Sequence, residues 1–462
     1  MPDAAAPFAA YLGGTVFHGR LTLRSPLHIG TGFARIESRE ADETSDVAEV
    51  IRGASDQPVL TPTALKGAMR AIVSAACGAE MAKRMFGEIL DHGDAAGRAG
   101  VLTPFAAPMR PPPQQGASAM TRSVRAAIDA AYGVPADRLL INADMVAPGA
   151  VFDLRLRLSG DPRVTPTDIL STTAALLRSL QLHGLRLGHG RGDGQGHLLL
   201  SALDKVEETF VANRRMATRD ALQGWNRCLD AQVPLATPAQ QRWTLHFRSD
   251  TPFLVQDPER TSAPALGQDG RARRNIIRAL KRDPGIPDLP GTSFMGALRA
   301  RAEWLLRLRQ MRGQAQCGEA LRVIKLFGLR AEQQRDASTV GQLAKSIGLP
   351  PAAVTGFAGL LVVEEIAFAN PQLVTLPGVK LDRFTHGPID GQLFETEAFL
   401  FDRLTVTLRL KPHPCNPHEA QALVDWVGLL LDEIGGTGPR AGLQLGHGGN
   451  RGYGWCELEK PT

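Results

Sequence analysis

Segments in which apolar and polar residues alternate occur in both halves of the chain and predict strands that bury one face. Residues 152–158 read FDLRLRL and residues 404–410 read LTVTLRL, with an apolar side chain at every second position. Each is followed by apolar residues at helical spacing, over residues 168–183 and 418–434, and both of these segments end near glycine, as helices often do. The pattern predicts a half-buried strand followed by an amphipathic helix in each half.

The two halves also share blocks of sequence that occur in the same order, which indicates an internal duplication. Within the first block, Gly67 and Arg70 of the first half match Gly296 and Arg299 of the second. The matched blocks are PVLTPTALKGAMRA at 58–71 with PDLPGTSFMGALRA at 287–300, MFGE at 85–88 with LFGL at 326–329, GRAGVL at 97–102 with GFAGLL at 356–361, and LGHGRGDGQG at 187–196 with LGHGGNRGYG at 445–454. The first block reads as a strand, a turn and the start of a helix that a Thr or Ser can cap.

The order of elements in each half defines the expected fold. It runs strand, variable loop, helix, long insertion, strand, helix, glycine-rich loop and final strand. This order predicts an α+β fold with two tandem ferredoxin-like (RRM-like) domains that carry insertions. We expect a first domain over residues 1–205, a helical connector over 206–241, and a second domain over 242–462.

The composition narrows the class of protein. With 462 residues and 43% apolar residues, the chain is large enough for two or three domains, and a net charge of +5 is only a modest lean toward polyanions. Its five cysteines are far apart and lack CxxC spacing, which argues against a disulfide framework and a zinc ribbon. We find no secretion signal, membrane-spanning stretch, P-loop or Ser-His-Asp order, and we therefore expect a cytoplasmic protein with no membrane partner.

The repeated motifs resemble those of the RAMP superfamily of CRISPR-associated proteins, and more narrowly the backbone subunits of type III (Csm/Cmr-like) interference complexes. LHIGTG at 27–32 opens the series in the first half, and VKLDRFTHGPIDGQLFETEAF at 379–399 precedes the last glycine-rich loop in the second. The resemblance covers nearly the whole chain, twice. It implies RAMP domains that hold a CRISPR guide RNA (crRNA) along a filament, with a thumb-like insertion that displaces a nucleotide. The tandem arrangement implies that one polypeptide fills two successive backbone positions, as in type III-D variants, and a two-domain Cmr-like end subunit is the alternative.

The two glycine-rich loops are candidate RNA grips, because backbone amides without an intervening Cβ can approach phosphate oxygens closely. Basic and histidine side chains lie in both loops, where an imidazole could stack on a base or bond a phosphate. The alternative is a tight turn between a helix and an edge strand. The residues expected to contact RNA here are Gly188, His189, Gly190 and Arg191 in the first loop and Gly446, His447, Gly448 and Arg451 in the second.

A second candidate contact lies at the start of the helix in the first repeated block. Lys66 and Arg70 are one helical turn apart, near a helix N-terminus that favours anions, so guide-RNA phosphate is the expected ligand. In the second half, Met295 replaces the lysine while Arg299 remains, which predicts a weaker grip. A solvated basic helix face is the alternative interpretation.

The resemblance further implies catalysis by an aspartate in the loop before this helix, acting on target RNA with a divalent metal, Mg²⁺ or Mn²⁺. Counting back from Leu65 places that aspartate at Asp46, where a carboxylate could hold the metal or accept the proton of a 2′-hydroxyl. The same count in the second half reaches Asn275, which cannot act as a base, so we expect one active and one inactive position. Because Asp42, Glu43, Glu49 and Asp56 are nearby, a merely solvated acidic loop is the alternative.

Two further loops complete the set of candidate RNA contacts. Residues 260–282 form the densest basic stretch of the chain and are expected to order on RNA or to remain a solvated insert. In the second half, Arg383, Phe384 and His386 occupy the position of the family's thumb. The first-half counterpart, around residues 124–140, has lost most of that pattern.

The leading hypothesis is a guide-RNA-binding backbone subunit of a type III effector ribonucleoprotein complex in antiviral defence. Its expected partners are the guide RNA, complementary target RNA and other subunits of the complex. The first domain would act as a metal-dependent endoribonuclease. The alternatives are a non-catalytic structural or end-capping subunit and a guide-RNA-processing endoribonuclease, although the latter branch normally carries a single C-terminal glycine-rich loop.

Overall fold

The computed structural model describes most of the chain and divides it into two compact units. The first comprises Met1–Arg191 and Gln195–Ala239, and the second comprises Gly192–Gly194 and Gln240–Thr462. The described residues are 13–38, 44–88, 98–111, 119–128, 135–160, 162–163, 165–212, 215–235, 241–257, 275–283, 285–411, 417–437 and 441–459.

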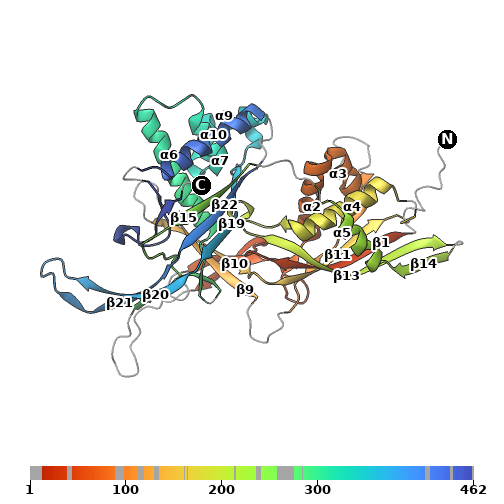
Figure 1. The fold of residues 1–462 in the computed structure, drawn as a ribbon, viewed down its shortest axis with the longest axis horizontal. Helices are drawn as coiled ribbons and strands as arrows, with labels where there is room; N and C mark the ends of the chain where they lie inside the picture. The colour runs from red at the N-terminus through yellow and green to blue at the C-terminus, as the bar shows by residue number, and fades with distance from the viewer. Residues whose placement is uncertain are drawn as a thin grey trace, which may run out of the picture. The chain divides into compact units, whose positions relative to one another are not determined.

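The first unit is built on an antiparallel sheet in which the strands follow the order β13-β1-β11-β7. Counted along the chain, this is the order 4-1-3-2 of a βαββαβ unit, in which a helix follows the first and the third strand. Figure 1 shows helices α2 and α4 together on one side of this sheet. The elements are β1 (Gly14–Leu23), α2 (Pro62–Cys77), β7 (Leu102–Pro104), β11 (Val151–Ser159), α4 (Thr167–Leu182) and β13 (His197–Ala212).

The second unit repeats this arrangement, with its sheet in the order β19-β22-β15-β24-β23. Its helices α6 and α10 occupy the places of α2 and α4. The elements are β15 (Arg242–Arg248), α6 (Gly291–Met311), β19 (Leu361–Ala369), β22 (Arg403–Leu410), α10 (Pro417–Ile434), β23 (Leu443–Gln444) and β24 (Trp455–Leu458). The expected α+β fold with two tandem ferredoxin-like domains is confirmed.

Each unit has its own hydrophobic core between the sheet and the helices. The alternation predicted from the sequence is observed, because every second residue of β11 and β22 is buried. In the first core, Phe17 of β1 and Leu65 of α2 are fully buried; in the second, Phe247 of β15 and Phe294 of α6 are. The rings of Phe247 and Phe294 meet edge to face, with centroids 5.9 Å apart, an arrangement that aromatic pairs favour.

The long insertions form smaller sheets beside the main ones. In the first unit the order is β2-β3-β10-β9, and in the second it is β16-β21-β20. Of the range 124–140, whose sequence pattern is weak, the described residues 124–128 and 135–140 lie in the antiparallel strands β9 and β10. The strands are β2 (Gly30–Ser38), β3 (Thr44–Val50), β9 (Met120–Ile128), β10 (Pro135–Val146), β16 (Asn275–Ile277), β20 (Gln372–Leu381) and β21 (Pro388–Leu400).

The segment expected to be a connector instead packs on the first unit. Strand β13 continues beyond residue 205 to Ala212 and pairs with β14 (Arg215–Asp220), and helix α5 (Leu222–Ala231) follows. The ring of Trp225 on α5 contacts Phe17 at a centroid distance of 4.7 Å. Its indole nitrogen donates a hydrogen bond to the buried carboxylate of Glu208 at 2.9 Å. Residues 206–239 are therefore part of the first unit.

The predicted side-chain caps form in one half only. Thr61 accepts a hydrogen bond from the amide of Ala64 at 3.3 Å and caps α2, whereas α6 starts after Pro290 without a side-chain cap. The remaining helices are α3 (Ala79–Phe86), α7 (Glu319–Phe327), α8 (Ala331–Arg335) and α9 (Ala337–Ile347), with short 3₁₀ turns at Arg191–Asp193, Pro351–Ala353 and Gly449–Arg451. Short strands are β4 (Val59–Leu60), β5 (Gly87–Glu88), β6 (Arg98–Ala99), β8 (Ala107–Pro108), β12 (Leu185–Arg186), β17 (Lys281–Asp283) and β18 (Ile286–Pro287). No helix in the described ranges combines the length and apolar character needed to cross a membrane.

Candidate nucleic-acid interface

The two glycine-rich loops have the same backbone structure. In the first, the amides of Leu187 and His189 donate to the carbonyls of Gly196 and His28, both at 2.9 Å. In the second loop, the amides of Leu445 and His447 donate to the carbonyls of Gly454 and Leu254, at 2.9 and 2.6 Å. Each loop is thus closed on itself and tied to the segment that follows the first strand of its unit.

This closure explains why glycine is needed in both loops. Gly188 and Gly446 have φ values of +78° and +79°, which side chains other than glycine rarely adopt. A Cβ atom would lie 2.2 Å from the carbonyl oxygen of His28 in the first loop and 2.3 Å from that of Leu254 in the second. The tight-turn interpretation therefore accounts for these glycines and for the amides of His189 and His447.

The loops also present side chains to a ligand. His189, Arg191, His447 and Arg451 are all exposed, whereas Gly190 and Gly448 are half-buried. Partial desolvation, and then the neighbouring charge of Arg451, hold the pKa of His447 below its ordinary value, which favours the neutral imidazole at pH 7. The second loop thus offers one cation, Arg451, beside a neutral ring that can stack or hydrogen-bond.

Arg451 connects the second loop with the hairpin of β20 and β21. Its guanidinium lies 5.5 Å from the centroid of the Phe394 ring on β21, within the range of a cation–π interaction. Phe394 is itself packed against Gly378 of β20, where an added Cβ would come within 2.5 Å of the ring. The hairpin and the loop of the second unit therefore share one packed junction.

The hairpin β20–β21 extends away from the main sheet of the second unit (Figure 1) and ends in the turn predicted to be a thumb. The carboxylate of Asp382 accepts hydrogen bonds from the amides of Phe384 and Thr385 at 2.9 and 2.8 Å. These bonds hold the pKa of Asp382 below its ordinary value. The turn leaves Phe384 93% exposed, with Arg383 and His386 exposed beside it.

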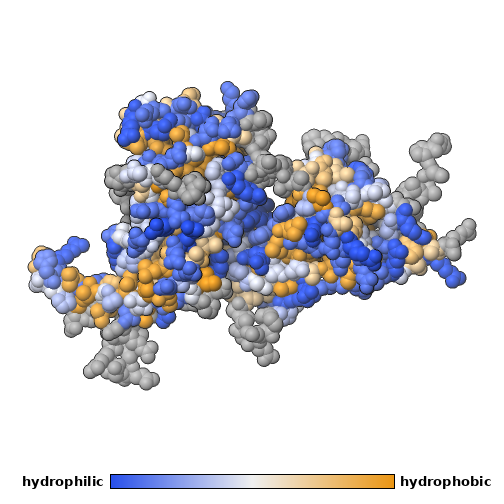
Figure 2. All heavy atoms as spheres, viewed as in Figure 1, coloured by the Kyte–Doolittle hydropathy of each residue, from blue (hydrophilic) through white to orange (hydrophobic). Residues whose placement is uncertain are grey.

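Apolar side chains continue from this turn along the hairpin, as the orange surface in Figure 2 shows. Such a concentration of exposed apolar residues on one projecting element is unusual for a free surface. Lys380 and Arg383 add positive charge near the tip. The exposed apolar residues are Leu373, Val379, Leu381, Ile389, Leu393 and Leu400.

Asp46 lies on β3 with its side chain exposed, opposite the exposed Ile36 on β2. The next residue, Val47, pairs with Asn142 of β10 in a parallel register. In the second unit, Asn275 opens β16, and the next residue, Ile276, pairs with Glu395 of β21 in the same parallel sense. Asn275 is itself paired with Phe394, whereas the parallel pairing of β3 starts at Val47. The bridges Leu27–Val146 and Phe253–Phe399 lie at equivalent places in the two units, and counted from them Asn142 corresponds to Glu395 and Asp46 to Asn275.

The carboxylates near Asp46 do not converge on it. Glu49 lies 3.8 Å from the guanidinium of Arg35, and Asp56 lies 3.6 Å from that of Arg52. Among the described residues, no three His, Cys, Asp or Glu side chains are grouped to hold a metal ion; Asp42 and Glu43 lie outside those residues. Asp46 alone fits a Mg²⁺ ion only as one of several oxygen ligands, the others coming from water and substrate phosphate.

Of the basic residues predicted to contact RNA at the start of the repeated helix, one is exposed to solvent and the other two are bonded within their own units. Lys66 is exposed near the start of α2, as expected for a phosphate contact. Arg70 instead donates to the carbonyl of Gly87 at 2.7 Å. Arg299 donates to the carboxylate of Glu303 at 2.9 Å, and burial lowers its pKa. Both arginines therefore have partners inside their own unit.

One carboxylate in each insertion sheet, buried in the first and half-buried in the second, was not anticipated from the sequence. Asp144 on β10 accepts from Arg35 at 2.5 Å and has Arg122 at 3.6 Å. In the second unit, Glu397 on β21 lies 3.1 Å from Lys281 and 3.6 Å from Arg278. An acidic residue among apolar positions of a strand is the sequence signal that could have identified both. Of the basic stretch 260–282, residues 260–274 lie outside the described residues.

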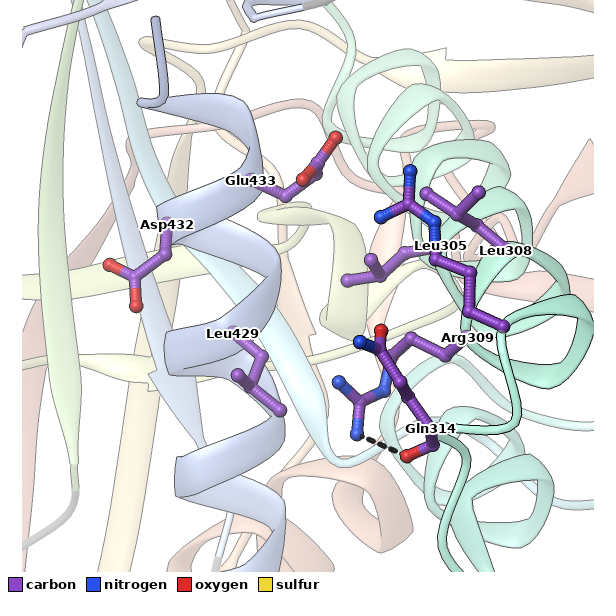
Figure 3. A pocket seen from close by; sticks show the side chains of 8 residues that line it. Leu305, Leu308, Arg309, Gln314, Leu429, Asp432 and Glu433 are labelled. Atoms are coloured by element: carbon purple, nitrogen blue, oxygen red, sulfur yellow. Dashed lines mark hydrogen bonds between the residues drawn. The ribbon is translucent and has the colours of Figure 1, made fainter. Parts of the chain in front are cut away.

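A groove with a volume of about 270 Å³ lies between α6 and α10 in the second unit (Figure 3). Its floor is apolar, with Leu305 and Leu429, and Arg309 lies on one wall. Arg309 donates to the carbonyl of Gln314 and to the carboxylate of Glu319, both at 2.9 Å. The guanidinium of Arg309 is therefore already bonded to groups of the second unit.

A comparison with protein-family models identifies the family of this chain. A model of the RAMP superfamily matches residues 20–198 and 245–457, one region in each unit. No curated protein matched the chain. Among solved structures, a chain from the apo-state cryo-EM structure of a type III-B Cmr-beta complex is similar over 42% of this chain and 97% of its own, at 12% identity and a TM-score of 0.30. Because the two RAMP matches together cover most of the sequence, the chain belongs to the RAMP superfamily.

Proposed function

We propose that this protein is a backbone subunit of a type III CRISPR effector complex, that it binds guide RNA through both units, and that its first unit cleaves complementary target RNA. The observation that carries the proposal is the equivalence of Asp46 and Asn275. Counting from the repeated helix gives this pair of positions, and the strand register supports the same pair when it is counted from the bridges Leu27–Val146 and Phe253–Phe399.

RNA binding is supported by what each unit exposes. The first loop offers His189 and Arg191, the second offers His447 and Arg451, and Lys66 adds a cation at the start of α2. Cations of this kind neutralise phosphates without reading sequence, which suits a protein that must accept any guide. The exposed ring of Phe384 suits insertion between bases at the end of a projecting hairpin.

Cleavage would depend on Asp46 and on the 2′-hydroxyl of the target strand. A carboxylate at this position can accept the hydroxyl proton or hold one face of a divalent ion. A bound Mg²⁺ or Mn²⁺ would stabilise negative charge that develops on the phosphate. Asn275 cannot accept that proton at neutral pH, and its uncharged amide oxygen is a weaker ligand for the ion than a carboxylate. The proposed complex is cytoplasmic and contains other subunits.

Incubating the guide-loaded complex with labelled complementary RNA and Mg²⁺ tests this proposal. We expect Asp46→Asn to abolish one cut site while the complex still assembles, and Asn275→Asp to create a new one. Chelation of the metal should stop cutting without releasing target RNA. Unchanged products with Asp46→Asn would overturn the catalytic part of the proposal.

A non-catalytic structural or end-capping subunit is the second candidate. It is favoured by the absence of a grouped set of metal ligands around Asp46 among the residues that the structure describes. The same assay distinguishes it, because such a subunit would support assembly and target binding but leave the target intact in every variant.

A further inference from the structure

A second hollow of the second unit, with a volume of about 260 Å³, lies directly beside the second glycine-rich loop. It is lined by Trp304, Ala297 and Ala300 of α6 and by Gln444 and Trp455. Gln444 and Trp455 are paired residues of β23 and β24, the two strands from which the loop emerges. A ligand held at this loop would therefore have the hollow next to it.

The two indole rings of this pocket come from different elements and are held in place. Trp455 donates its amide hydrogen to Thr251 Oγ1 at 3.2 Å, and its carbonyl accepts from Ser249 at 2.8 Å. Its ring covers Gly442, where an added Cβ would come within 2.9 Å of it. Both indoles are only partly buried, so part of each ring faces the pocket.

Arg301 completes one wall of the pocket. Its guanidinium carbon lies 5.3 Å from the centroid of the Trp304 ring, and it donates to the carbonyl of Gly442 at 2.7 Å. Arg301 thus stacks on the Trp304 ring and is bonded to the turn that the Trp455 ring covers. Its positive charge lies close to both aromatic surfaces. The alanines of α6 leave the space between these groups unfilled.

The first unit shows that the fold does not need tryptophan at these positions. By the repeat register, Trp304 corresponds to Ala75, and Trp455 corresponds to His197. His197 lies over Gly184 as Trp455 lies over Gly442, but its ring is bonded to the carbonyl of His183 at 2.9 Å. The pair of indoles is therefore a feature that the second unit has in addition to the shared architecture.

We infer that this pocket binds one unpaired nucleobase of an RNA whose phosphates lie along the second glycine-rich loop. Aromatic side chains beside cations are the usual platform for single-stranded RNA, because every base has a π-face and every linkage a negative charge. The inference rests on the proposed RNA-binding function and adds a site that only the second unit carries. The bases of a guide RNA held in this unit would not all be equivalent.

Equilibrium binding to the full-length protein tests the inference, with two probes: a single-stranded uridine decamer and an abasic decamer of the same length. Stacking on one aromatic side chain accounts for roughly a 5- to 150-fold difference in affinity. We expect Trp304→Leu to weaken binding of the uridine decamer by a factor in this range and to leave the abasic decamer unaffected. Trp304→Phe, which keeps a ring, should restore most of the affinity, and Ala75→Leu in the first unit is the matched control.

The outcomes separate this inference from the proposed function. If wild type binds both probes and Trp304→Leu changes neither, the pocket is not a base site, although RNA binding stands. Equal weakening of both probes would indicate a structural role for Trp304 and also overturn the inference. If wild type binds neither probe, the proposed function fails with it. Loss of another subunit from the complex with RNA affinity unchanged would assign the pocket to a protein partner instead.

Discussion

Replacing Glu419 by glutamine should destabilise the second unit far more than the equivalent change, Asp168→Asn, destabilises the first. In the second unit, the ammonium of Lys325 on α7 is fully buried and bonded to Glu419 on α10. In the first unit, Arg84 on α3 bonds to Asp168 on α4 at 2.6 Å, but the two side chains are 41% and 47% exposed. The same helix pair is thus joined by a buried ion pair in one unit and by a surface ion pair in the other.

The difference in burial sets the expected magnitudes. Removing one partner of a buried pair costs about 3–5 kcal/mol, because the remaining charge is left without compensation. Glu419 is 24% exposed, so water partly replaces it, and we expect a loss of about 2–3 kcal/mol in the free energy of unfolding. Exposed pairs contribute about 0–1 kcal/mol. In a unit of this size, each kcal/mol of lost stability lowers Tm by about 2–4 °C. We therefore expect Tm to fall by about 4–12 °C for Glu419→Gln and by at most a few degrees for Asp168→Asn.

Differential scanning calorimetry measures these shifts, and amide hydrogen exchange over α10 and α4 assigns them to a unit. The double variant Lys325→Met with Glu419→Leu removes both charges and should recover most of the lost stability. Equal effects of Glu419→Gln and Asp168→Asn, or no recovery in the double variant, would refute the explanation by burial.

Three further results are expected from the same structure. Gly188→Ala and Gly446→Ala should each lower the free energy of unfolding by about 2 kcal/mol or more, because the new Cβ meets a carbonyl oxygen at positive φ. Gly67→Ala lies in a helix where the new Cβ would have no atom within 4 Å, and it should instead stabilise the protein by up to about 1 kcal/mol. Urea unfolding of the three variants measures these differences. Burial raises the pKa of Cys456 to about 12, so mass spectrometry after iodoacetamide at pH 8 should find the exposed Cys77, Cys228 and Cys317 alkylated and Cys456 intact. Because the folded state holds the pKa of His447 below its ordinary value of 6.5, the unfolded chain takes up the proton first, and stability should fall as the pH drops below about 6.5; His447→Asn should flatten that fall in urea unfolding measured from pH 8 to 5.

Much of the fold could be predicted because the duplication repeats each signal. The alternating strands, the helices after them and the two glycine-rich loops all occur where the sequence indicates. The helix caps were predicted for both halves, but Pro290 occupies the N-cap position of α6, and its side chain has no oxygen that could accept a hydrogen bond from a helix amide. Residues 206–239 were expected to be a connector because the contact between Trp225 and Phe17, which anchors this segment, joins residues far apart in the sequence and is not visible in the local pattern.

The candidate site could be predicted less completely. Lys66 and Phe384 are exposed, as their positions in the motifs suggest, but Arg70 and Arg299 look equally available in the sequence and have partners in the fold. Their acceptors, Gly87 and Glu303, are set by the packing of neighbouring helices rather than by local pattern. The pocket lined by Trp304 and Trp455 brings together residues about 150 positions apart, and no local sequence motif predicts it.

Ultraviolet crosslinking of the guide-loaded complex, followed by mass spectrometry, tests most directly the claim that both units hold the guide. Crosslinked peptides are expected from both glycine-rich loops, one containing His189 or Arg191 and one containing His447 or Arg451, each joined to a different guide nucleotide. Crosslinks confined to one unit, or none from either loop, would contradict it.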